Sequence, residues 1–507
     1  MLDRLFFPSV PPTHQITQTG SVTRGTVDRL LAVPTRAVGI SDCDRRPELF
    51  RFGVECQQQP FHWRSPLDTQ PPIEQLQHEL QIARWSLASR VSFRFCFAYF
   101  GLYCLATQIF TSLFPIPNVD IPDLSTRWPL RQIIFWTAAH VFRVPTPLVY
   151  YSGGSGDKTF DWVLVFCLLV FATLSTVLWS LLDSKRQNYV TLYKWFRLFI
   201  RLSLAGQMIF YGMIKIIPSQ MPFPFLARLV EPFGNFSPMG VLWSSIGASP
   251  AYETFTGCAE MLGGLLLLVP RTTLFGALIC MADTVQVFML NMTYDVAVKL
   301  LSFHLVLMAL FLLAPDLPRL ANLFFLNRPA GPSTEPQLFA TRRANRIALA
   351  AQILFGIWLV ALSAYGVWDE WHTSGGGSPK SPLYGIWNVE QLSIDGQLHA
   401  PLLTDYDRWR RVIFDTPDRN TFQRIDDSLV RCSASFNLND KTLVLTKDDD
   451  KSWKANFTFQ RVAPDQLTLD GEMDSHKLHM QLHLVDRSKF LLINRGFHWI
   501  QEYPFNR

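Results

Sequence analysis

The 507-residue sequence has little of what defines several large protein classes. It contains only eight cysteines, and no two are spaced as CxxC, which disfavours both a disulfide scaffold and a dithiol redox motif. There is no basic stripe interleaved with aromatic residues, so the net charge of +5 does not indicate nucleic-acid binding. Ligand patterns for haem, flavin and iron–sulfur clusters are missing as well. If the protein takes part in a redox reaction, a partner subunit would therefore have to supply the electrons.

The beginning of the chain has neither the apolar core of a signal peptide nor sustained hydrophobic periodicity. Residues 1–77 are rich in Pro, Gln, Thr and Arg, and we interpret them as a mostly disordered extension. At its end, the spacing of Ile73, Leu76 and Leu80 predicts a short amphipathic helix on the cytoplasmic membrane face.

Long apolar runs are concentrated in the middle of the chain. About 20 apolar residues suffice to cross ~30 Å of hydrocarbon. By this criterion residues 78–374 form an α-helical membrane bundle of about seven transmembrane helices. The segment 130–144 is too short and too charged to span, so we predict a re-entrant or interfacial helix there. The expected spans are 91–114, 162–182, 197–217, 252–270, 272–291, 296–315 and 347–368.

The distribution of Lys and Arg between these spans predicts the orientation of the bundle. The densest basic loop begins at Asp183, with the sequence DSKRQNYVTLYKWFRLFIR. The positive-inside rule places such a loop in the cytoplasm. Alternation then puts the N-terminus in the cytoplasm and the C-terminal domain outside. We therefore expect a multi-pass protein of a bacterial inner membrane with a periplasmic C-terminal domain.

Ionisable residues within the spans define the candidate site, because a charge at membrane depth is costly unless it is paired or hydrated. Counting through the tight turns between spans places Glu260, Asp283 and His304 at one depth, and we predict that they handle protons. A Pro- and Phe-rich loop after residue 217 is expected to cover them. The predicted substrate-binding residues, mostly in a shallower layer, are Lys215, Lys299, Asp295, Asn291 and Gln286.

Two plainer interpretations of these residues stay open. Lys215 and Lys299 lie within about one turn of the outer surface and would reach lipid head groups equally well. The carboxylates would also be satisfied by hydrogen bonds within the bundle. The small residues Gly257, Gly263 and Gly264 predict close packing between helices rather than a phosphate-binding loop.

After a flexible linker at residues 375–382, the hydrophobic period changes to two. Residues 383–507 contain short β-rich runs separated by Asp, Asn and Gly, which predict an antiparallel lipocalin-like barrel or sandwich of about eight to ten strands. The Gly385-Ile386-Trp387 stretch resembles the opening of lipocalin-type barrels, with Arg495 as the expected stacking partner of the tryptophan. His479 and His483 would lie ~13 Å apart on one strand, so we expect no metal site.

Several stretches between residues 197 and 320 carry a family resemblance. They are YGMIKIIPSQMP (Tyr211–Pro222), GNFSPMGVLW (Gly234–Trp243), TGCAEMLGGLLLL around Glu260, RTT (Arg271–Thr273) and MLNMTYDVAVKLLSFHL (Met289–Leu305). Together they resemble the DoxX family of membrane proteins, in a large variant with extra N-terminal spans and a C-terminal β domain. The resemblance implies a four-helix membrane unit associated with redox complexes, as in DoxD-like proteins and thiosulfate:quinone oxidoreductase. The group is more distantly similar to the membrane part of vitamin K-dependent carboxylases.

The resemblance and the buried charges together suggest a quinone-linked redox subunit or accessory protein of a membrane oxidoreductase complex. Its expected partners are membrane lipid, a quinone and a redox subunit. A non-enzymatic envelope transport or assembly protein, whose β domain binds a lipid or protein, is the alternative. A carboxylase-like enzyme that modifies a lipid or another substrate is a third hypothesis, and it requires Lys215 or His140 at the core cavity.

Overall fold

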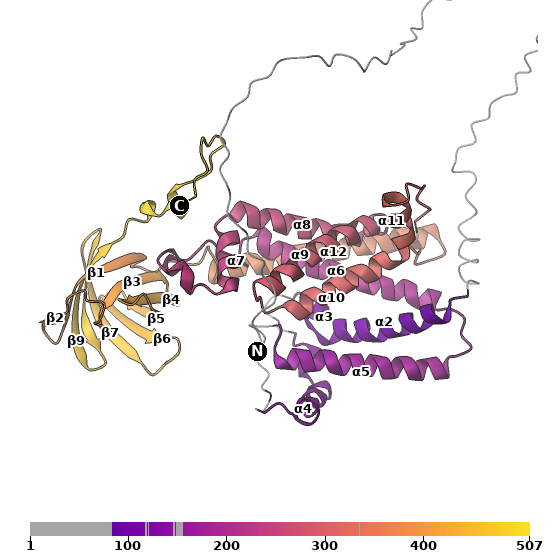
Figure 1. Ribbon diagram of the computed structural model, residues 1–507, viewed down its shortest axis with the longest axis horizontal. Coiled ribbons are helices and arrows are strands. Elements are labelled where there is room, and N and C mark those ends of the chain that lie inside the picture. Colours follow the sequence, from indigo (N-terminus) through magenta and orange to yellow (C-terminus); the bar gives the residue numbers. More distant parts are fainter. Residues whose placement is uncertain are drawn as a thin grey trace, which may run out of the picture. The chain divides into compact units, whose positions relative to one another are not determined.

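The computed structural model describes residues 84–116, 119, 121–145, 148, 156–333 and 335–506. The extension predicted for residues 1–77, and most of the amphipathic helix expected after it, lie outside these residues. The described chain forms a bundle of α-helices and an antiparallel β-barrel (Figure 1). The prediction of a helical region followed by an all-β domain is therefore confirmed.

Five helical segments are long and apolar enough to cross a membrane, which indicates a multi-pass membrane protein. They correspond to five of the predicted spans, and Figure 1 shows the long helices running side by side. The segments contain α5 (Thr159–Leu182), α6 (Val190–Ile216), α9 (Thr273–Thr293), α10 (Lys299–Leu313) continuing into α11 (Leu317–Phe324), and α12 (Arg342–Thr373).

The first and fourth predicted spans form helices that are not among these five segments. The helix α2 (Leu87–Ala106) ends earlier than predicted, because Thr107 is extended and a separate short helix, α3 (Gln108–Thr111), follows. Within α2, the buried Arg94 guanidinium donates to the Tyr189 hydroxyl at 2.6 Å. The fourth span corresponds to α8 (Pro250–Leu268), which carries two buried acidic residues, Glu253 and Glu260.

Two shorter helices complete the described bundle. The predicted non-spanning helix is α4 (Leu130–His140), which has eleven residues. Its Trp136 side chain is exposed and stacks on His140 at 4.9 Å between ring centroids. In the loop after α6, Ser237 caps α7 (Pro238–Gly247) by accepting a hydrogen bond from the Gly240 amide at 3.0 Å.

Close packing in the bundle depends on glycines at the helix crossings. A Cβ atom at Gly257 would lie 2.6 Å from the Gly212 carbonyl oxygen, so α6 and α8 meet backbone to backbone. At Gly264 a Cβ would lie 3.0 Å from a backbone oxygen of α6, and at Gly263 2.9 Å from a sulfur of α9. The prediction of close helix packing at Gly257, Gly263 and Gly264 is confirmed.

The β domain is a closed up-and-down barrel of eight strands, so the barrel alternative holds and the sandwich does not. Neighbouring strands pair antiparallel in chain order, and β1 pairs with β9 to close the barrel. The two-residue β2 (Gln397–Leu398) only extends the end of β1. The eight strands are β1 (Gly385–Ile394), β3 (Trp409–Thr416), β4 (Arg419–Arg424), β5 (Leu429–Asn437), β6 (Thr442–Lys447), β7 (Lys454–Ala463), β8 (Gln466–Met473) and β9 (His476–Leu484).

Large apolar side chains fill the barrel interior. Trp387, Phe414 and Met480 are fully buried in one apolar cluster. The Trp387 indole donates to the Leu383 carbonyl at 2.8 Å. Arg461, rather than Arg495, lies over the Trp387 ring at 5.7 Å from its centroid, so the predicted stacking partner was wrong. The Arg495 guanidinium lies over Phe505 instead.

The loop between α6 and α7 contacts the outer surface of the barrel through residues 225–230, here called the roof segment. Leu226 packs against the buried Ile386 and Ile413 side chains, and its amide donates to Asp415 at 3.0 Å. The Gln423 side-chain nitrogen Nε2 donates to the Val230 carbonyl at 3.4 Å. Burial raises the pKa of Asp415, although the hydrogen bond from the Leu226 amide opposes this. The contact is therefore both apolar and hydrogen-bonded.

Candidate functional site

A cavity of about 300 Å³ lies among α6, α8, α9 and α10. The residues that follow α6, including Gln220 and Met221, line it together with Leu242 and Trp243 of α7. These covering residues are fixed in place, because the Met221 amide donates to Glu253 at 2.8 Å and the Trp243 indole donates to the Gln220 carbonyl at 2.9 Å. The loop after residue 217 thus covers one side of the cavity.

A buried ion pair forms part of the cavity wall. Lys215 Nζ donates to Glu260 Oε2 at 2.7 Å, and the two side chains are only 8% and 7% exposed. The pair joins α6 to α8 because the glycine crossing at Gly212 and Gly257 brings the two backbones together. The Lys215 Cβ lies beside Gly257, one turn before Glu260 on α8, and the buried lysine side chain reaches Glu260 from there.

Asp283 of α9 lines the same cavity and leaves an acceptor free. Its Oδ2 atom is buried and has no hydrogen-bond partner among the described residues. The Gln220 side-chain oxygen, also at the cavity, is likewise buried without a hydrogen-bond partner among the described residues. A buried polar atom without a partner is unfavourable, so both oxygens favour a ligand that donates hydrogen bonds. With the Lys215–Glu260 pair neutral overall, an ionised Asp283 makes the cavity net negative.

Gln286 and Asn291, also on α9, are the other predicted substrate-binding residues that line the cavity. The Asn291 side chain donates to Ser302 Oγ on α10 at 3.0 Å, which ties the two helices together. Leu301 and Leu305 of α10 contribute apolar surface to the lining. The cavity thus combines a few polar groups with an apolar lining, as is common in sites for small amphiphilic ligands.

His304 lies outside the cavity lining, although it is next to Leu305 in sequence. Its Nε2 atom is 2.7 Å from the Tyr99 hydroxyl of α2, and its ring stacks on Tyr103 at 3.7 Å between centroids. The Nδ1 atom is 2.6 Å from the Leu300 carbonyl oxygen. Counting residues through the turns gives depth along a helix but not direction around it, and His304 faces α2.

Lys299 and Asp295 are also outside the cavity lining. They pair with each other at 2.9 Å, and the Asp295 side chain is 83% exposed. The Asp157 carboxylate accepts hydrogen bonds from the Lys299 and Leu300 amides at 2.8 and 2.9 Å, so it caps α10. These contacts place Lys299 at the end of the bundle.

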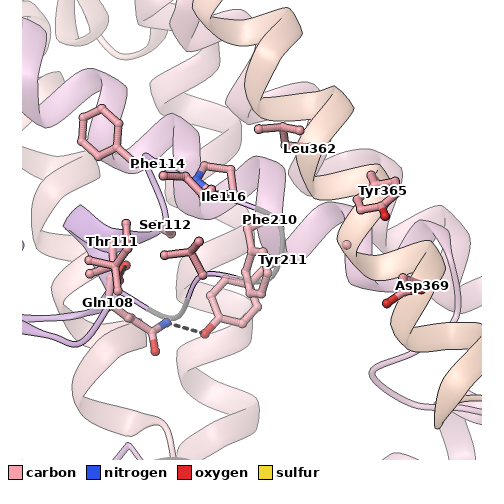
Figure 2. Close-up of a pocket in the computed structure, with 14 residues that line it drawn as sticks. Gln108, Thr111, Ser112, Phe114, Ile116, Phe210, Tyr211, Leu362, Tyr365 and Asp369 are labelled. Atoms are coloured by element: carbon pink, nitrogen blue, oxygen red, sulfur yellow. Dashed lines mark hydrogen bonds between the residues drawn. The ribbon is translucent and has the colours of Figure 1, made fainter.

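The sequence did not single out Tyr211, which lines this cavity and also a second, more open pocket of about 460 Å³. Gln108 of α3 donates to the Tyr211 hydroxyl at 2.9 Å. Figure 2 shows this hydrogen bond, with Leu362, Tyr365 and Asp369 of α12 across the second pocket. The sequence spacing could have identified Tyr211 as a cavity residue, since it precedes Lys215 by one helical turn and shares its face of the helix.

The sequence analysis also did not predict a second cluster of buried charges, which joins α6 to the loop before α12. Arg197 and Arg201 of α6 are each 2% exposed, and each donates to a different oxygen of Glu335 at 2.8 Å. Arg201 also donates to Gln352 of α12. Two arginines four residues apart within an apolar helix were the sequence signal. The Glu335 carboxylate, which comes from the loop before α12, could be located only in three dimensions.

The three histidines of β9 each face a different aspartate. His476 contacts Asp395 at 2.6 Å, His479 contacts Asp470 at 2.5 Å, and His483 is 3.8 Å from Asp465. Within the described residues, no three His, Cys, Asp or Glu side chains are grouped to hold a metal ion. At the other candidate histidine, His140, the Nδ1 atom is 2.9 Å from the Trp136 carbonyl oxygen, and the residue does not line the cavity.

Comparison with known proteins gives one relative of unknown function. No protein-family model and no solved structure matches the chain. The uncharacterized protein YwoB of Bacillus subtilis (strain 168) is 32% identical over 133 residues, which cover 24% of this chain and 79% of the relative. This match therefore indicates a family but assigns no activity to it. Through the matched region, the chain belongs to the same protein family as YwoB.

Proposed function

We propose that this protein is a DoxX-like quinone-binding subunit or accessory protein of a membrane oxidoreductase complex. The observation that supports the proposal best is the cavity that combines the Lys215–Glu260 ion pair, the free acceptor of Asp283 and apolar walls. A quinol has two hydroxyl donors on an apolar body, and these properties match the free oxygens and the apolar surface. A partner subunit would carry the electrons.

The chain's own residues would orient the ligand and move its protons. The Asp283 carboxylate would accept a hydrogen bond from one hydroxyl and take up its proton as the ring is oxidised. The Lys215 ammonium would donate to a ligand oxygen, and Glu260 would hold that ammonium in position. A bound quinol would supply two electrons to the partner and two protons, of which Asp283 would take up one and the Glu260 carboxylate the other.

The membrane arrangement proposed with this function has seven crossings. In it α2 and α8 cross the bilayer in addition to the five apolar segments. The basic loop between α5 and α6 and the exposed Arg271 between α8 and α9 would then both lie in the cytoplasm. The cavity, which lies near the opposite ends of these helices, would open toward the periplasm of a bacterial inner membrane. The barrel would lie on the same side.

Quinone binding to purified protein in lipid nanodiscs tests the proposal. We expect saturable binding of a short-chain quinol that weakens roughly tenfold in Asp283→Asn, since a tenfold change corresponds to the loss of about one hydrogen bond to a charged group. Asp295→Asn is the matched control, because Asp295 is also a carboxylate near this end of the bundle but is 83% exposed. Binding that is absent, or equal in both variants, would contradict the assignment.

An envelope-assembly role is the second candidate, and one observation on the β domain favours it. Residues 495–506 expose several large apolar side chains: Phe497, Trp499, Ile500 and Tyr503 are 77–91% exposed. Exposed apolar patches often mark protein or membrane contacts. Photo-crosslinking in cells from position 499, with the exposed Leu438 position as a control on the barrel, tests this role. A discrete adduct from position 499 alone supports it, and equal labelling of both positions rejects it.

A further inference from the structure

An apolar groove lies between the N-terminal halves of α6 and α12, away from the quinone-type cavity. Its volume is about 470 Å³, and it is open on one side. Leu198 and Leu202 form the α6 wall, while Ala348, Ala351 and Phe355 form the α12 wall. The alanines create the depression, because their short side chains leave space that larger residues on α12 would fill.

The groove offers almost no hydrogen-bonding capacity to a ligand. Apart from the Trp195 indole, Gln352 has the only polar side chain among its lining residues. Gln352 is already engaged, since its oxygen accepts from Arg201 and its nitrogen donates to the Ala348 carbonyl at 3.0 Å. The groove is therefore suited to a hydrocarbon chain and not to a polar substrate.

Two cations lie one turn beyond the apolar walls on the same helix faces. Lys194 precedes Leu198 by four residues on α6, and Arg343 precedes Ile347 by four residues on α12. Neither forms an ion pair with an acidic residue in the part of the chain that the structure describes. Helical side chains lean toward the N-terminus, so both cations extend past the same end of the groove.

The dimensions of the groove match one leaflet of a bilayer. From Ala344 to Phe355 the α12 wall rises by eleven residues, or ~17 Å, close to half of the ~30 Å hydrocarbon core. Trp195, which is 46% exposed, lies at the cationic end, where tryptophan commonly marks the membrane interface. An apolar channel of this length with cations at its mouth has the charge and shape of an anionic phospholipid.

We propose that this groove binds one acyl chain of an anionic phospholipid, with the lipid phosphate against Lys194 and Arg343. The lipid would also contact Leu338 and Phe339, which line the groove three and four residues after Glu335. It would thereby hold the loop whose Glu335 carboxylate joins Arg197 and Arg201. This inference is independent of the quinone proposal, because it concerns a different surface of the bundle.

Native mass spectrometry of the full chain with phosphatidylglycerol and phosphatidylcholine tests the site. We expect the wild type to retain phosphatidylglycerol preferentially, and Lys194→Gln and Arg343→Gln each to weaken retention roughly fivefold, as expected for about one cation near an anionic head group. Arg271→Gln is the matched control, because Arg271 is exposed at the same end of the bundle. Its retention should equal that of the wild type.

Filling the groove provides a second, uncharged test. Ala348→Phe should abolish phosphatidylglycerol retention by occupying the acyl-chain position. If that variant does not fold, the two charge variants alone decide the question. Equal retention of both lipids by the wild type, or equal loss in Lys194→Gln and Arg271→Gln, would overturn the proposal. Undiminished retention by a folded Ala348→Phe would place the lipid elsewhere and would also overturn it.

Discussion

The Lys215–Glu260 pair gives the sharpest test of the bundle, because its energetics differ from those of a surface pair. The Nζ–Oε2 distance is 2.7 Å and both side chains are more than nine-tenths buried. At an effective dielectric constant of about 20, two unit charges at this distance attract by about 6 kcal/mol. Desolvation offsets much of this attraction, so the pair contributes little net stability while each half depends strongly on the other.

The expected result is strong non-additivity. Lys215→Met or Glu260→Met alone should lower the free energy of unfolding by about 3–5 kcal/mol, because each leaves an unpaired buried charge. The double variant Lys215→Met/Glu260→Met should recover most of that loss, because two apolar side chains of similar size replace the pair. Denaturant-induced unfolding of the purified protein in mixed micelles measures all four members of the cycle.

An exposed pair supplies the control for this cycle. Asp295→Asn breaks the Lys299–Asp295 contact of 2.9 Å, but the aspartate side chain is 83% exposed. Its effect should stay below about 1 kcal/mol. If the two methionine variants each lose less than about 1 kcal/mol and their effects add, the buried ion pair does not form and the argument for an ordered cavity fails.

Three further predictions concern packing, pH and the roof segment. Gly257→Ala should destabilise the bundle by about 1–3 kcal/mol through overpacking, whereas Gly366→Ala on α12, which has open space, should have little effect in the same unfolding assay. The Asp395 carboxylate raises the pKa of His476, so this pair's contribution to barrel stability should be present below about pH 6.5 and be lost as pH rises through the raised pKa. Thermal unfolding at several pH values, followed by near-UV circular dichroism, measures this pH dependence of stability. The His476→Gln variant should reduce the dependence, and an unchanged dependence in that variant would contradict the prediction. Asp415→Ala should speed hydrogen exchange of the roof segment amides about tenfold, and unaltered exchange would show that the segment is held without that carboxylate.

Residue patterns alone determined the elements of the fold. Apolar runs of about 20 residues located α5, α6, α9, α10 and α12, because a membrane span is a local property of composition and length. Alternation with period two located the β domain, since one face of each strand is buried in the barrel. Glycine spacing likewise located the close helix crossings, where only a hydrogen atom fits between backbones.

The tertiary structure decided which of the charged residues meet. Counting along the chain predicted a common depth for Glu260, Asp283 and His304, but rotation about each helix axis determines which side chains share a space. That rotation turns His304 toward Tyr99 and leaves Asp283 at the cavity. Lys215 reaches Glu260 only because two glycines let α6 and α8 approach, and barrel closure similarly depends on long-range pairing of β1 with β9. Such contacts join residues distant in sequence, so their geometry is set by packing of the whole chain.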